Sequence, residues 1–219
     1  QEANNALVSE IAERKRAEKV KEDFVSTVSH ELRTPMTSIK GSLGLIRSGT
    51  TGEVPDEFRS MLDIAYNNSD RLIRLINDIL DIGRIESGTL DHQMAPLELG
   101  GLLDDALDAN EGYGIEYNVT FVRSNDAPDA HVYGDQDRLI QVMTNLISNA
   151  AKFSSENDRV EISLSRGNGG FRIAVTDHGA GIPEDFHDRI FGKFSQADAT
   201  DARRKGGTGL GLYIAKAIV

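Results

Sequence analysis

Apolar residues recur at every third or fourth position between residues 24 and 46, which is the spacing of one face of an α-helix. These positions are Phe24, Val28, Leu32, Met36, Ile39, Leu43 and Ile46. His30 lies two residues from both Val28 and Leu32, so at about 100° per residue it points away from this face. We therefore predict a helix that buries one face and holds an imidazole toward solvent, with Arg33 and Thr34 beside it.

The segment before this helix, residues 1–23, is rich in charged helix formers, and no glycine or proline interrupts it. We expect a solvated linker helix, with a possible weak coiled coil, that runs directly into the His30 helix. Pro35 cannot donate its backbone hydrogen bond, so we expect a kink there.

A second apolar stripe, from Phe58 to Ile82, follows a loop over residues 48–56. Two amphipathic helices joined by a short loop form an antiparallel hairpin. A hairpin this thin cannot bury both stripes alone, so we expect residues 24–90 to form a homodimer, an all-α four-helix bundle.

The remainder, residues 91–219, mixes helical and strand-like patterns. The expected helices cover 97–108 and 135–153, and the expected strands cover 119–123, 160–166 and 171–177. Glycines at 167, 169 and 170 predict that the last two strands form a hairpin. We predict an α+β two-layer sandwich of antiparallel strands with helices on one face.

Composition excludes several classes of protein. The 219 residues carry a formal net charge of −11, which argues against nucleic-acid binding. There is no cysteine, so the chain forms no disulfide or thiolate metal site. No run approaches the ~18 apolar residues of a membrane span, and the N-terminus lacks a signal-peptide core, so we expect a soluble cytoplasmic chain.

Two asparagines on the 135–153 helix are candidates for binding chemistry. Asn145 and Asn149 are one turn apart and Lys152 is almost one turn further on. An amide oxygen can bind Mg²⁺, and a lysine can neutralise phosphate. The alternative is an ordinary polar helix face.

Two glycine-bearing stretches add to this pattern. Residues 177–183 (DHGAGIP) follow a strand, and residues 206–212 (GGTGLGL) open the last helix. A glycine-rich loop that runs into a helix N-terminus offers backbone amides to phosphate. Neither GxGxxG nor GxxxxGK[ST] is present, which disfavours a dinucleotide fold or a P-loop. The small polar segment over residues 195–206 is expected to be a mobile lid.

The order and spacing of these motifs resemble the catalytic core of sensor histidine kinases of two-component systems. HELRTP at 30–35 matches the phosphoacceptor motif. The N, DxGxG, F and GxGLG boxes match residues 137–153, 177–181, 191–194 and 207–211. The ERKRAE run at 13–18 is similar to the linker that often follows an upstream sensor domain. The resemblance covers the chain from about residue 24 onward and implies that residues 91–219 lack the C-terminal end of the ATP-binding domain.

This resemblance implies roles for the histidine and its neighbours. A neutral nitrogen of His30 attacks the γ-phosphate of ATP, and the phosphoryl group then passes to an aspartate in the receiver domain of a response regulator. Glu31 orients the ring and accepts its proton. Thr34 is linked to dephosphorylation of the regulator.

The resemblance also implies a Mg·ATP site. Asn149 binds the Mg²⁺ that bridges the phosphates, and Asp177 reads the adenine amino group. The other residues expected around the nucleotide are Asn145, Lys152, Phe153, Gly179, Gly181, Gly207, Thr208, Gly209, Leu210 and Gly211.

Two other functions are weighed against a histidine kinase. One is a nucleotide-binding pseudokinase or dimeric scaffold, which the intact His30, Glu31 and Asn149 disfavour. The other is a gyrase-type ATPase, a class that carries a water-activating glutamate where this chain has Asn145.

Overall fold

The computed structural model describes residues 2–50, 52–125, 127, 129–167, 169–196 and 207–219. The chain forms two compact units, Gln1–Leu90 and Asp91–Val219. The first is a helical hairpin and the second combines helices with two small sheets. None of the described helices has a stretch that is long and apolar enough to span a bilayer.

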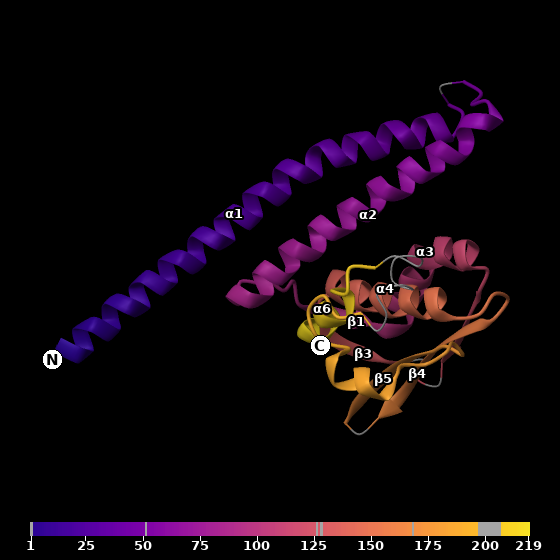
Figure 1. Ribbon diagram of the computed structural model, residues 1–219. Coiled ribbons are helices and arrows are strands. Elements are labelled where there is room, and N and C mark those ends of the chain that lie inside the picture. The colour runs from indigo at the N-terminus through magenta and orange to yellow at the C-terminus, as the bar shows by residue number, and fades with distance from the viewer. Residues whose placement is uncertain (1, 51, 126, 128, 168, 197–206) are drawn as a thin grey trace. The chain divides into compact units, whose positions relative to one another are not determined.

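The hairpin consists of α1 (Glu2–Arg47) and α2 (Asp56–Ser87), which run antiparallel (Figure 1). As expected, α1 is continuous from the linker segment through Pro35, and Figure 1 shows it curving along its length. Helix α2 ends at Gly88, whose φ of 67° is left-handed and whose N–H meets the carbonyls of Arg84 and Ile85. Glycine adopts this conformation at little cost, which explains why the helix stops there.

Most of the apolar stripe of α1 stays exposed within one chain, although Met36 and Leu43 are half-buried. Phe24 is 66% exposed, and Leu32 and Ile39 are about half exposed. The face of α1 that meets α2 is instead the neighbouring one, which includes Val25, close to Gly83, and the buried Ser29. One chain alone therefore leaves most of the predicted buried face open to solvent.

The second unit contains a three-stranded sheet in the order β2-β4-β5 and a two-stranded sheet, β1-β3. The strands are β1 (Ala95–Glu98), β2 (Thr120–Asn125), β3 (His131–Gly134), β4 (Arg159–Gly167) and β5 (Gly170–Thr176). The predicted β4–β5 hairpin is confirmed, with Gly167 paired to Gly170. The expectation of an all-antiparallel arrangement is wrong, because β2 pairs with β4 in parallel and α4 lies between them in sequence.

The helices of this unit are α3 (Leu99–Tyr117), α4 (Gln136–Phe153), the 3₁₀ helix η1 (Glu184–Arg189) and α6 (Gly211–Ile218). Helices α3 and α4 pack against each other and over one face of the larger sheet (Figure 1). Their contact with β4 forms a core whose fully buried side chains include Leu102, Leu103, Ile147, Ile162 and Leu164. The predicted two-layer α+β fold is confirmed.

Two elements differ from their predicted extents. Helix α3 begins at Leu99 and continues to Tyr117, well beyond the expected 97–108, and it accommodates Gly112 and Gly114. The four-residue strands β1 and β3 were not predicted, since they are too short to show an alternating pattern. The predicted lid falls mainly on residues 197–206, which lie outside the described residues.

Candidate functional site

His30 stands on the solvent side of α1, with 73% of its side chain exposed. Ser29 is buried against α2, so the next residue along the helix is turned outward. The Nδ1 atom of His30 lies 3.6 Å from Oε1 of Glu31, which is close enough for a charge to act but too long for a hydrogen bond. The hydroxyl of Thr34 donates to the backbone carbonyl of His30 at 3.3 Å.

Helix α4 carries the two asparagines of the candidate nucleotide site. It begins at the buried Asp135, whose Oδ1 accepts the backbone N–H of Arg138 at 3.1 Å, a regular N-cap. Its inner face contributes Ile147 to the core, which leaves Asn145 and Asn149 half-buried outside that core.

Asp135 also fixes the segment that leads into this unit. Its Oδ2 accepts the backbone N–H of Gln93 at 2.8 Å. Burial alone raises the pKa of this carboxyl, but the N–H groups of Arg138 and Gln93 and the charge of Arg138 outweigh it, so the pKa is lowered. Sequence reasoning missed this residue, although an aspartate just before an apolar helical pattern is a recognisable cap signal.

The glycine-rich loop 207–211 lies along the same part of α4. The side-chain amide of Asn145 donates to the carbonyl of Gly211 at 3.1 Å. A Cβ on Gly207 would stand 2.8 Å from Nζ of Lys152, so the loop backbone passes close to this ammonium group. The N–H of the buried Leu210 donates to Oγ1 of Thr208, which fixes the turn into α6.

The same loop also contacts the segment before the predicted lid. Gly209 has a φ of 69° and lies against the backbone of Phe194 and Ser195. The side chain of Gln196 donates to the carbonyl of Gly207 at 3.0 Å. Sequence reasoning did not identify Gln196, and no motif marks it.

The loop after β5 meets the other end of α4. Asp177 is exposed, and its Oδ1 accepts the N–H of Gly179 at 2.9 Å. Any Cβ at Gly179 would collide with the backbone carbonyl of Phe153, so only glycine allows this approach. Gly181 has a φ of 75°, which also favours glycine.

The predicted residues of the ATP-binding unit therefore lie around α4. Loop 207–211 lies beside Asn145 and Lys152, and loop 177–181 reaches the helix end at Phe153, whose ring is about half exposed. Lys152 also lies over the Phe153 ring, 4.8 Å from its centre. The arrangement presents amide groups, a cation and glycine backbone, which suits a phosphate-bearing ligand.

The donor set also fits Mg²⁺. Within the described part of the chain, no three His, Cys, Asp or Glu side chains gather to hold a metal ion. Mg²⁺ needs no such cage, since it usually takes one or two protein oxygens and completes its shell with phosphates and water. The amide oxygen of Asn149 is a ligand of the right kind.

Two family models match the chain. Residues 20–88 match the "His Kinase A (phospho-acceptor) domain". Residues 134–219 match the "Histidine kinase-, DNA gyrase B-, and HSP90-like ATPase".

Curated relatives and solved structures agree with these matches. The chain is 36% identical over 210 residues to the signal transduction histidine-protein kinase BarA of Escherichia coli K12, covering 93% of this chain and 22% of BarA. It is 33% identical over 216 residues to the sensor histidine kinase WalK of Bacillus subtilis 168, covering 98% of this chain and 35% of WalK. The crystal structure of full-length ShkA in complex with AMPPNP superposes with a TM-score of 0.67 at 31% identity, covering 90% of this chain and 40% of ShkA.

The chain thus spans about a fifth to a third of the length of these curated relatives. Within that span it contains both the phosphoacceptor helices and the ATPase-type unit, in the same order. The chain belongs to the sensor histidine kinases of two-component signal transduction.

Proposed function

We propose that this chain binds ATP with Mg²⁺ and transfers the γ-phosphoryl group to His30. The observation that carries the proposal is the exposed imidazole of His30 with the Glu31 carboxylate 3.6 Å from Nδ1. A carboxylate on one side of the ring favours a proton on Nδ1 and leaves Nε2 as the nucleophile. The AMPPNP named with ShkA, an ATP analogue, supports the choice of nucleotide.

In the transfer, a bond forms between Nε2 of His30 and the γ-phosphorus as the bond from that phosphorus to the β–γ bridging oxygen breaks. ADP leaves, and Glu31 takes up the Nδ1 proton as the ring accepts the phosphoryl group. Phosphoryl transfer depends mainly on positioning and charge neutralisation. Lys152 and the backbone amides of loop 207–211 position the phosphates and neutralise their charge. Asp177 accepts a hydrogen bond from the adenine amino group.

Asn149 would hold Mg²⁺ through its amide oxygen, and the bound ion would supply positive charge to the phosphates. Asn145 donates to Gly211, so it orients the loop. Neither asparagine can act as a general base toward water, because an amide does not accept a proton at neutral pH. The absence of a base at these two positions supports phosphoryl transfer to His30 over hydrolysis of ATP by water.

We further propose that the phosphoryl group passes from His30 to an aspartate in the receiver domain of a response regulator, and that the hairpin pairs with a second copy. Hybrid kinases among the relatives support the regulator as partner. The exposed apolar stripe of α1 supports the second copy. An upstream sensor domain and a cytoplasmic location complete the proposal.

Thr34 has a separate role in this proposal. Its hydroxyl lies one turn from His30 and can position a water for hydrolysis of the regulator's acyl phosphate. We expect Thr34→Ala to lower phosphatase activity toward a phosphorylated regulator more than it lowers His30 phosphorylation. Equal losses in both assays would remove this separate role.

Incubation with γ-labelled ATP tests the main proposal against its two alternatives. A kinase gives protein-bound label that is acid-labile and base-stable, and that is lost in His30→Gln. Free phosphate without bound label would indicate an ATPase. Nucleotide binding with neither product would indicate a scaffold.

A further inference from the structure

Polar contacts between α1 and α2 follow one register along part of the hairpin. Arg47 pairs with Asp63 at 2.8 Å, Lys40 pairs with Asp70, and Arg33 bonds to Asn77. The partners step by seven residues on each helix, from 33 to 40 to 47 on α1 and from 77 to 70 to 63 on α2. Each layer therefore joins a basic residue of α1 to a polar residue of α2.

The layer next to His30 differs from the other two because its α2 partner carries no charge. Both Nε and Nη2 of Arg33 donate to Oδ1 of Asn77, at 3.0 and 2.7 Å. Lys40 and Arg47 instead meet carboxylates. Among the described residues, Arg33 has no carboxylate partner, so its guanidinium is held in place without being neutralised.

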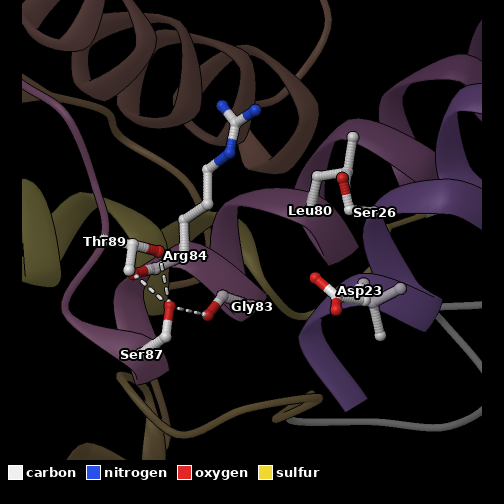
Figure 2. A pocket seen from close by; sticks show the side chains of 8 residues that line it. Asp23, Ser26, Leu80, Gly83, Arg84, Ser87 and Thr89 are labelled. Atoms are coloured by element: carbon white, nitrogen blue, oxygen red, sulfur yellow. Dashed lines mark hydrogen bonds between the residues drawn. The ribbon is translucent and has the colours of Figure 1, made fainter. Parts of the chain in front are cut away.

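On the other side of His30 no bond of this kind continues the register in the described part of the hairpin. One further step in the register places Ser26 opposite Arg84, and both line a pocket between the helices together with Asp23 (Figure 2). In the described structure Arg84 forms no ion pair with Asp23 or with another carboxylate. The arginine layer next to His30, Arg33 with Asn77, is therefore the one whose geometry bears on the imidazole.

The acidic residues of this part of α2 are engaged elsewhere. Asp78 is half-buried and Asp81 is buried, and each has an interaction of its own. Neither bonds to Arg33, whose contact is with Asn77. Glu31 is the carboxylate that approaches the imidazole itself.

We infer that Asn77 is a positioning residue that keeps Arg33 in place while leaving its positive charge uncompensated beside the phosphoryl group arriving at His30. The inference rests on the proposed function and assigns to it two residues outside the nucleotide unit. Arg33 is three residues from His30, so the two side chains are neighbours on the helix surface. A fixed cation near a group that gains negative charge stabilises the transition state, and a carboxylate at 77 would cancel that effect.

Asn77→Asp separates this role from a structural one. The new carboxylate gives Arg33 the kind of ion pair that Lys40 and Arg47 already have, and it can bind the guanidinium in a bidentate way. The unfolding temperature of the hairpin should therefore stay the same or rise. The rate of His30 phosphorylation at saturating ATP should fall about tenfold, while KM for ATP stays unchanged because the nucleotide is held by the other unit. A residue with only a structural role would not lower activity while preserving stability.

Matched variants complete the test. Asn68→Asp makes the same substitution at an exposed site of α2 and should leave the rate at the wild-type value. Arg33→Gln should lower the rate as Asn77→Asp does, and Arg33→Lys, which keeps the charge, should retain most of it. The inference is overturned if Asn77→Asp phosphorylates at the wild-type rate, or if Asn68→Asp loses as much. Wild-type protein without label on His30 would instead overturn the proposed function.

Discussion

In the described structure no backbone carbonyl binds the ring of His30, in contrast to three other histidines of the chain. His131, His178 and His187 each place a ring nitrogen within 3.0 to 3.3 Å of a backbone carbonyl. A nitrogen in that position carries the proton, and the bond fixes the orientation of the ring. Because the ring of His30 faces a carboxylate and solvent, its second nitrogen is available for chemistry.

At the same scale, Asn149→Asp tests the magnesium position. The change adds a negative charge beside the phosphates, so we expect Mg·ATP affinity to fall about tenfold while the unfolding temperature stays near that of the wild type. Isothermal titration calorimetry measures the affinity, and Asn157→Asp, at an exposed site, controls for the added charge. Equal affinity in Asn149→Asp and the wild type would remove Asn149 from the site.

Among the elements, the sequence predicted those whose signals are local. Apolar periodicity identified α1, α2 and α4, and glycine spacing identified the β4–β5 hairpin and loop 207–211. The parallel pairing of β2 with β4 was not predictable, because it joins strands that are separated by the whole of α4. Helix α3 continues through Gly112 and Gly114 because packing overrides their weak helix propensity.

For the candidate site too, the sequence predicted only what a local pattern shows. The motifs marked the glycines and asparagines, but contacts between distant segments carry no local signal. The bond from Gln196 to Gly207 and the bond from Arg33 to Asn77 are of this kind. A motif predicts which side chains take part in the chemistry. The residues that hold those side chains in place are known only once the fold brings distant segments together.

Helix α4 gives a prediction on pH. The pKa of Asp135 is lowered in the folded state, so its ionised form stabilises the fold above about pH 4 and this contribution is lost as pH falls through the folded-state pKa. Asp135→Asn retains one acceptor for the helix cap but loses the second bond, to Gln93. We expect this variant to unfold at a lower temperature than wild type at pH 7, with the difference shrinking in acid. A constant difference between pH 7 and pH 3 would contradict this role.

For the whole molecule, the exposed stripe of α1 should be the dimer interface. Ile39 is 47% exposed in one chain, and a carboxylate there would have to be desolvated between two copies. We expect Ile39→Glu to shift the protein from dimer to monomer in analytical ultracentrifugation. Ile115→Glu, at a 78% exposed site of the other unit, should leave the dimer intact. A dimer of unchanged stability in Ile39→Glu would place the interface elsewhere.

The most direct test of the whole account is to locate the phosphoryl group after reaction with Mg·ATP. Tandem mass spectrometry under conditions that preserve phosphohistidine should find one added phosphoryl group, on His30, in the wild type and none in His30→Gln. A phosphoryl group on any other residue, or ATP consumed with none on the chain, would contradict the account.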